Sequence, residues 1–246
     1  MTLQDFFSAH PKVALGFSGG VDSAYLLWAA LAAGAEVRPY FVQTPFQPAF
    51  EWEDARRLGR ELGVKITVIP LELPEQVLAN PENRCYFCKK ALMAALKIRA
   101  KQDGFLTLLD GTNASDVPEQ RPGMRALEEL EVLSPLRVCG LTKEEIRKRS
   151  RKAGLFTWDK PAYACLATRF PAGMEITKEL LARVEAAEKA MMDLGFSDLR
   201  VRVFHDAARV QVRERDMERL LAQRKNVLGA LKPYFNVVML DLEGRP

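Results

Sequence analysis

Short apolar runs alternate with longer amphipathic stretches through most of the chain. The apolar runs predict strands at 12–18, 36–44, 65–71 and 105–110. Helical periodicity between them predicts helices at 22–33, 48–62 and 80–101. Strands that alternate with helices of this length indicate a parallel sheet with right-handed crossovers. The sequence therefore predicts an α/β fold, a doubly wound parallel sheet.

The pattern changes after Gly173. From there the periodicity predicts a helix, an antiparallel pair of strands, a second helix and a last strand. These elements are predicted at 175–194, 199–206, 208–215, 216–231 and 236–242. They make a small α+β unit with a sheet of its own. We therefore expect two domains, 1–172 and 173–246.

Composition and charge narrow the class of protein and the partners that it could bind. Of the 246 residues, 48% are hydrophobic and 28% charged, as in ordinary soluble globular proteins. The net charge of +4 is too small to indicate a nucleic-acid partner by itself. The first residues have no signal-peptide pattern, and no apolar run reaches the ~18–20 residues that span a bilayer. We expect a cytoplasmic protein with no membrane partner, in which four cysteines suggest a metal site or catalysis rather than disulfides.

The first predicted strand runs directly into a Ser-Gly-Gly turn and a helix. Gly19 and Gly20 can adopt backbone angles closed to other residues, and the following helix presents free amides to an anion. Ser18 and Ser23 add hydroxyl donors, and Asp22 could hold Mg²⁺ beside a phosphate. The Walker pattern with its lysine is absent, which argues against transfer of a γ-phosphoryl group. The alternative is a plain Gly-Gly turn before a helix.

This loop, SGGVDS, resembles the PP-loop of the ATP pyrophosphatases, which cradles the β,γ-pyrophosphate of ATP while the α-phosphorus is attacked. A second segment, GTNASD, follows the strand predicted at 105–110. It resembles the other nucleotide and Mg²⁺ segment of that superfamily. The residues that the resemblance assigns there are Gly111, Thr112, Asn113 and Asp116.

Three cysteines occur in sequence contexts typical of metal ligands or nucleophiles. Cys85 and Cys88 form a C-x-x-C at the start of a predicted helix, and Cys165 comes far later, between Lys160 and Arg169. Three thiolates could hold a [4Fe–4S] cluster with one iron open. Zinc is the rival, with Cys139 as a fourth ligand, although a small buried apolar residue is the simpler interpretation of Cys139. Nearby cations would favour the thiolate of Cys165 as a nucleophile.

Six segments occur in an order that resembles the LarE-type ATP-dependent sulfur transferases of nickel-pincer nucleotide synthesis, the pathway of the lactate racemase cofactor. They are SGGVDS, RCYFCKKAL, GTNASD with RPGMRAL, SPLRVCGLTKEEIR, DKPAYACLATRFPAG and LRVRVFHDAARVQV. The resemblance implies that ATP adenylates a carboxylate of pyridinium-3,5-biscarboxylate mononucleotide and that sulfur then replaces AMP, giving a thiocarboxylate.

The resemblance leaves two sources for the sulfur. In one variant of the family the cysteine that aligns with Cys165 gives up its own sulfur, and in the other three cysteines hold a [4Fe–4S] cluster that delivers sulfide. With Cys85, Cys88 and Cys165 present, this sequence resembles the cluster variant. The implied cofactors are ATP, Mg²⁺ and the cluster. The implied partners are the small-molecule substrate, a donor that reloads the cluster with sulfur, and further copies of the chain in a homo-oligomer.

Arginines near and within the predicted hairpin could bind the substrate phosphate. Arg200 and Arg202 stand at i and i+2, on one face of a strand, and two guanidiniums on one face can bind a phosphate. Arg169 is assigned to the same site. The alternative is a solvated strand face.

Two other functions remain open at this point. A tRNA thiolase of the same superfamily would need a broad basic surface and an added domain, and neither is evident in the sequence. An ATP-binding iron–sulfur sensor would not form pyrophosphate when the pyridinium substrate is added. We expect an enzyme with no nucleic-acid partner.

Overall fold

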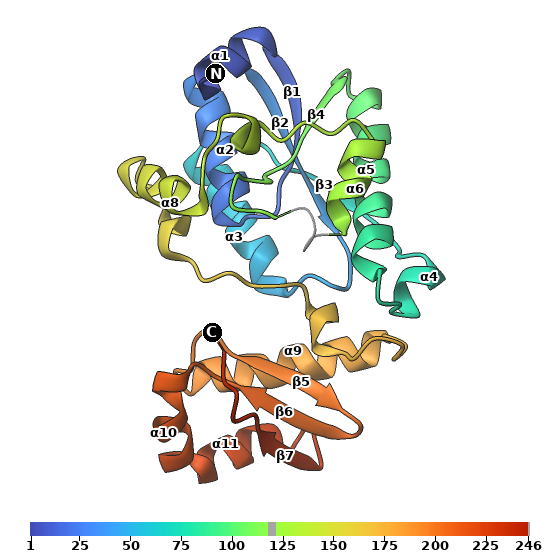
Figure 1. Ribbon diagram of the computed structural model, residues 1–246, viewed down its shortest axis with the longest axis vertical. Helices are drawn as coiled ribbons and strands as arrows, with labels where there is room; N and C mark the ends of the chain where they lie inside the picture. Colours follow the sequence, from blue (N-terminus) through green and yellow to red (C-terminus); the bar gives the residue numbers. More distant parts are fainter. Residues whose placement is uncertain (118–121, 246) are drawn as a thin grey trace. The chain divides into compact units, whose positions relative to one another are not determined.

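The structure is a computed structural model that describes residues 1–117 and 122–245 (Figure 1). The chain forms two compact units. The first comprises residues 1–44, 49–77 and 83–160, and the second comprises 45–48, 78–82 and 161–246. Each unit has a sheet of its own. The predicted α/β class, with a parallel sheet and a second, smaller sheet, is confirmed.

The first unit is built on a four-stranded parallel sheet with the order β3-β2-β1-β4. Its strands are β1 (Lys12–Gly16), β2 (Glu36–Gln43), β3 (Thr67–Pro70) and β4 (Thr107–Leu109). β1 is central and pairs with β2 on one side and β4 on the other. Its residues Val13, Ala14 and Leu15 have no exposed surface. The loop that follows β1 therefore starts from the middle of the sheet.

Helices cover both faces of this sheet. Val13 and Leu15 pack into one apolar cluster, whereas Ala14 packs into another, because successive side chains of a strand point to opposite faces. Figure 1 shows α2 and α3 on one face and α5 and α6 on the other. The helices of this unit are α1 (Leu3–Ala9), α2 (Val21–Ala32), α3 (Ala49–Glu61), α4 (Glu75–Leu78), α5 (Arg84–Gln102), α6 (Gly123–Glu129), α7 (Pro135–Val138) and α8 (Lys143–Lys152), with a 3₁₀ turn, η2 (Phe156–Asp159).

The second unit contains a three-stranded sheet with the order β5-β6-β7. Its elements are η3 (Leu166–Arg169), α9 (Lys178–Asp193), β5 (Arg200–Phe204), β6 (Ala207–Gln211), α10 (Glu214–Ala222), α11 (Arg224–Leu231) and β7 (Val237–Leu240). β5 and β6 are antiparallel, as predicted, and β7 pairs parallel to β6. The helix predicted at 216–231 is two helices, since the chain breaks at Gln223.

The division between the units differs from the predicted boundary at Gly173. Residues 161–172 belong to the second unit, and so do two short excursions of the chain at 45–48 and 78–82. Backbone hydrogen bonds explain this, because Leu166 N–H donates to the carbonyl of Phe46 and Ile176 N–H to that of Leu78. The small unit is thus assembled from three stretches of the chain.

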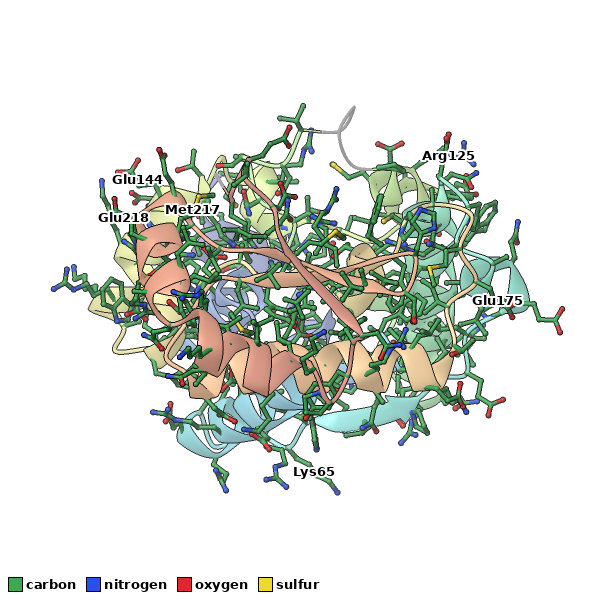
Figure 2. The ribbon with its side chains drawn as sticks, turned by 90° about the horizontal axis from the view of Figure 1, so that it is seen from below. Lys65, Arg125, Glu144, Glu175, Met217 and Glu218 are labelled. Carbon is green, nitrogen blue, oxygen red and sulfur yellow. The ribbon has the colours of Figure 1, made fainter. Side chains whose placement is uncertain are left out.

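The surface carries charges of both signs. Lys65, Glu144 and Glu218 are exposed, and their side chains extend into solvent (Figure 2). Within the described ranges, none of the helices has the length and apolar composition that crossing a membrane requires.

Candidate functional site

The loop between β1 and α2 has a backbone shape that requires glycine. Gly19 has φ of +72°, and a Cβ placed there would lie 3.1 Å from the carbonyl oxygen of Glu51 and 3.2 Å from the amide nitrogen of Ala55. A side chain would therefore collide with the backbone of α3. Gly20 is the N-cap residue of α2, and it has no side chain that could accept hydrogen bonds from the first amides of the helix. Those amides therefore stay available to an anion.

Two hydroxyls line the same turn. The oxygens of Ser18 and Ser23 are 3.2 Å apart, and the Ser18 N–H donates to Ser23 Oγ at 3.3 Å. Ser18 is exposed, while Ser23 is 4% exposed. Ser23 therefore fixes the turn, and Ser18 lies on its exposed side. The predicted loop residues lie together as a set of donors.

The GTNASD segment meets this loop from the end of β4. Asn113 Nδ2 donates to Asp22 Oδ1 at 3.3 Å, and Asn113 N–H donates to Asp116 Oδ2 at 3.0 Å. A Cβ on Gly111 would lie 3.1 Å from the amide nitrogen of Ser23, so the two segments touch through their backbones. The structure brings the two predicted nucleotide segments together around the start of α2. Arg121, the first residue of RPGMRAL, lies outside the described residues.

Asp110 is a buried carboxylate beside these segments that the sequence analysis did not single out. It accepts hydrogen bonds from the hydroxyls of Thr112 and Ser134, both at 2.7 Å, and pairs with Lys89 at 3.2 Å. Burial opposes its ionisation, but Lys89 and the hydroxyl donors outweigh that effect and lower the pKa of Asp110. This cluster fixes Thr112 relative to α5.

We expect Asp110→Asn to lower the free energy of unfolding at pH 7 by about 3 kcal/mol, because Lys89 and its hydroxyl partners lose a charged acceptor. A carboxyl group whose pKa is lowered by folding stabilises the fold at pH values above its ordinary pKa of 3.8. This stabilisation is lost as the pH falls through the pKa of the folded state. The difference between wild type and variant should therefore shrink below pH ~4. Urea unfolding across pH measures both effects. Asp193→Asn, which breaks an exposed pair with Lys189, is the control, and an equal loss in the two variants would contradict the role of Asp110.

Lys143 is the second residue that the sequence analysis missed. It opens α8, and its ammonium pairs with Asp22 Oδ2 at 2.5 Å. Its backbone N–H donates to Ser115 Oγ at 3.0 Å, which ties α8 to the GTNASD segment. The lysine that the loop itself lacks is thus supplied by another helix. The sequence signal, T-K-E-E before an apolar position, also fits an ordinary helix start.

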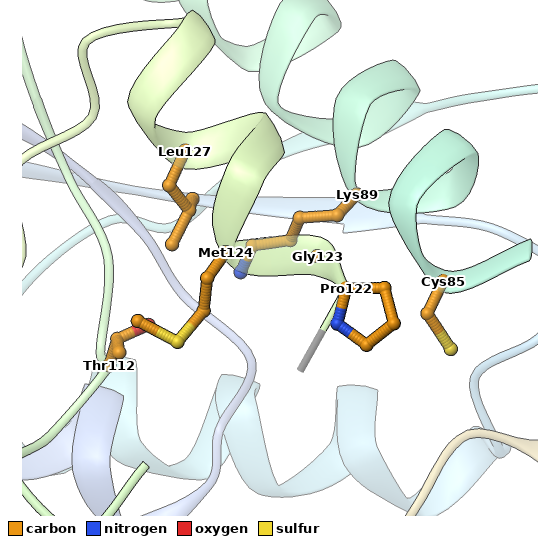
Figure 3. A pocket seen from close by; sticks show the side chains of 7 residues that line it. All are labelled: Cys85, Lys89, Thr112, Pro122, Gly123, Met124 and Leu127. Atoms are coloured by element: carbon orange, nitrogen blue, oxygen red, sulfur yellow. The ribbon is translucent and has the colours of Figure 1, made fainter. Parts of the chain in front are cut away.

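A pocket of about 300 Å³ adjoins this site within the first unit (Figure 3). Cys85 and Lys89 line it from α5, Met124 and Leu127 from α6, and Thr112 from the GTNASD segment. One cation, a hydroxyl and a thiol therefore share a cavity with apolar side chains. Such a mixture suits a small ring that carries a carboxylate.

Cys165 lies in the second unit, half-buried, directly before η3. Arg169, assigned by the sequence analysis to the substrate phosphate, is 1% exposed. Its Nε and Nη2 each donate to Glu188 at 2.8 Å, and its Nη1 donates to the carbonyls of Ala164 and Cys165 at 2.8 and 3.2 Å. These contacts occupy the guanidinium within the protein, so a phosphate would have to displace one of them.

Arg200 and Arg202 also hold the Cys165 segment. Arg200 donates to the carbonyl of Ala162 at 3.0 Å, and Arg202 donates to that of Thr168 at 2.6 Å. Burial, followed by the charges of Arg169 and Arg245, lowers the pKa of Arg200 to about 10. Several guanidiniums thus share one region of the small unit, where an anion would be favoured.

Comparison with known proteins decides the family. No family model matches the chain. An uncharacterized protein of Synechocystis sp. is 35% identical over 98% of this chain and 92% of its own length. A pyridinium-3,5-bisthiocarboxylic acid mononucleotide synthase of Lactiplantibacillus plantarum is 31% identical over 95% of this chain and 86% of its own length.

The chain belongs to the LarE family. The resemblance drawn from the six segments is thereby confirmed. A glutamine-dependent NAD⁺ synthetase of Aquifex aeolicus matches a shorter part, 34% identical over 76 residues, which are 29% of this chain and 13% of the relative. That match agrees with a PP-loop fold for this LarE family member.

The cysteines of this LarE family member fall into separate settings. Cys85 is exposed and Cys88 half-buried near the start of α5 in the first unit, and neither forms a disulfide. Within neither unit do the described residues group three side chains suited to a metal ion. Cys139 packs against the apolar cluster around α2, and burial raises the pKa of its thiol. This setting suits the interpretation of Cys139 as a small buried residue.

Proposed function

We propose that this LarE family member is an ATP-dependent sulfur transferase that converts a carboxylate of pyridinium-3,5-biscarboxylate mononucleotide into a thiocarboxylate. The observation that carries the proposal is the meeting of SGGVDS, GTNASD and Lys143 around Asp22. It occurs in a chain that matches a pyridinium-3,5-bisthiocarboxylic acid mononucleotide synthase over 95% of its length. The named product of that relative supports the substrate class.

The first half of the reaction follows from the nucleotide residues. A carboxylate is a poor electrophile because its leaving group would be oxide, and adenylation replaces that group with AMP. The amides at the start of α2, with Ser18 and Ser23, would bind the pyrophosphate of ATP. Asp22 and Asp116 would hold Mg²⁺, which neutralises phosphate charge. Lys143 would exchange its pairing with Asp22 for one with a phosphate oxygen.

The second half concerns the small unit. Arg200 and Arg202 would bind the substrate phosphate, with Arg169 beside them, and the segment they hold would carry Cys165 to the activated carbonyl. Sulfur that forms a bond to the carbonyl carbon expels AMP, which leaves with the electron pair of the broken bond. Excluding water from the activated carbonyl and the attacking sulfur would protect the adenylate from hydrolysis.

The thiols of Cys85, Cys88 and Cys165 are of the chemical type that binds iron–sulfur clusters. Cys85 and Cys88 form no disulfide and lie one helical turn apart near the start of α5. When bound by Cys85, Cys88 and Cys165, a [4Fe–4S] cluster would supply sulfide through an open iron. A separate donor would then reload it, and the enzyme would work as a homo-oligomer in the cytoplasm. The alternative donor is the sulfur of Cys165 itself.

Pyrophosphate release tests the proposal. The protein is purified anaerobically and mixed with ATP, Mg²⁺ and the pyridinium substrate, and AMP, pyrophosphate and thiocarboxylate are measured. We expect all three to form only when the substrate is present. ATP that remains unchanged would overturn the proposal. Thiolation of bulk tRNA under the same conditions would point to a tRNA thiolase instead.

Intact mass after turnover distinguishes the two donors. An unchanged polypeptide mass and broad visible absorption would indicate the cluster. A colourless protein that loses one sulfur atom per turnover would indicate that Cys165 is consumed. Cys85→Ala would abolish repeated turnover only in the first case.

A further inference from the structure

The segment that carries Cys165 is held in place by side chains. Residues 161–165 form no helix or strand, and the short η3 follows them. Carbonyl groups along the segment accept hydrogen bonds from guanidiniums, since Arg169 binds those of Ala164 and Cys165 and Arg202 binds that of Thr168. Thr168 Oγ1 also donates to the Cys165 carbonyl at 2.9 Å. The position of the thiol therefore depends on the arginines.

Glu188 fixes the most central of these arginines. It projects from α9, is 1% exposed, and accepts two parallel bonds from Arg169 at 2.8 Å. The same carboxylate accepts the N–H of Val201 at 2.9 Å, at the start of β5, and the hydroxyl of Tyr163. Glu188 thus joins a helix and a strand of the small unit to the irregular segment. A bidentate pair of this kind sets the orientation of the guanidinium plane as well as its distance.

The remaining amino group of Arg169 donates to the segment that carries Cys165. With Nε and Nη2 on Glu188, its Nη1 reaches the carbonyls of Ala164 and Cys165 and the hydroxyl of Thr168, the last at 2.8 Å. The guanidiniums of Arg169 and Arg200 lie 4.6 and 4.7 Å from the ring centre of Tyr163. The chain of contacts runs from Glu188 through Arg169 to the backbone of Cys165.

We propose that Glu188 is a positioning residue for Cys165, acting through Arg169. The use of Cys165 in sulfur transfer rests on the proposed function, whereas the placement of its thiol can be tested without any turnover. A contact that served only the stability of the small unit would, when lost, raise the alkylation of Cys165 only by increasing the unfolded fraction of that unit. A positioning contact changes the reactivity of Cys165 alone.

Alkylation rates test this directly. The full chain, freed of metal with a chelator, is treated with iodoacetamide, and peptide mass spectrometry follows Cys165 and, as internal reference, Cys139. Glu188→Gln keeps the size of the side chain but removes the charge and one acceptor. Thr168→Val removes the hydroxyl between Arg169 and the Cys165 carbonyl and leaves the buried ion pair intact, so it serves if the first variant does not fold. Glu179→Gln makes the same chemical change as the first variant at an exposed position of α9.

We expect the ratio of Cys165 to Cys139 alkylation to rise about two- to tenfold in both test variants, the equilibrium effect of losing one hydrogen bond. The ratio should not change in Glu179→Gln. A ratio in Thr168→Val equal to that of wild type, or a rise that disappears once the rates are corrected for the unfolded fraction of the small unit, would overturn the proposal. Failure of wild type to form thiocarboxylate would refute the proposed function and leave this result standing.

Discussion

Lys143→Gln lowers the rate of pyrophosphate release by about 10²–10³-fold, the effect of removing one preorganised donor from a transition state. The ammonium already lies at Asp22, beside the amides at the start of α2, so no rearrangement of the chain is needed to meet a phosphate. Glutamine keeps much of the length and loses the charge. The measurement is a coupled pyrophosphate assay with ATP and the pyridinium substrate at saturation.

Lys148→Gln is the matched control for this variant. Lys148 belongs to the same helix, is largely exposed and pairs with Glu144. Because exposed pairs of this kind contribute little, its rate should stay close to wild type. If Lys143→Gln also stays within about threefold of wild type, far short of the effect of a lost transition-state donor, Lys143 does not act on the nucleotide.

Cys165→Ser abolishes thiocarboxylate formation, a loss on the order of 10³-fold or more, as for removal of a nucleophile. AMP formation in a single turnover should persist, because the residues proposed to bind ATP belong to the first unit and remain unchanged. Serine retains the size of cysteine, so the surrounding bonds of Arg169 are preserved. Chromatography of the nucleotide products, with detection of the thiocarboxylate by mass spectrometry, measures both halves.

Cys139→Ser is the control, since Cys139 packs against the apolar cluster around α2. It should form thiocarboxylate at the rate of wild type, after correction for the folded fraction. Thiocarboxylate produced by Cys165→Ser at a rate near that of wild type would exclude Cys165 from the transfer, whichever donor supplies the sulfur.

The fold of the first unit could be predicted because its signals are local. β1 is a buried apolar run that ends at a Ser-Gly-Gly turn, and every strand of its sheet falls within a predicted segment. The prediction failed at Gln223. Helical periodicity continues through this residue, so the sequence predicted one helix, but the chain forms two. The parallel pairing of β7 with β6 was not predictable, because strand direction depends on the route of the chain through space.

The site was predictable only as far as its residues are close in sequence. Ser18, Asp22 and Asn113 belong to short segments next to strand ends, and the structure brings them together. Lys143 reaches Asp22 across 121 positions, and no local pattern marks that contact. Arg169 shows the converse limit. Its charge was visible in the sequence, but the buried acid that engages it, Glu188, lies on a helix whose pattern predicts only an apolar face.

The interleaving of the two units limits how this protein can be taken apart. Three stretches, 45–48, 78–82 and 161–246, build the small unit, so a fragment that starts at Gly173 would lack the backbone partners that Asn80 and Leu78 provide. Such a fragment would also lose Arg169, leaving the carboxylate of Glu188 buried without its counter-ion. Gene fusion or shuffling at that point would therefore yield two damaged pieces, and the small unit is not an exchangeable module.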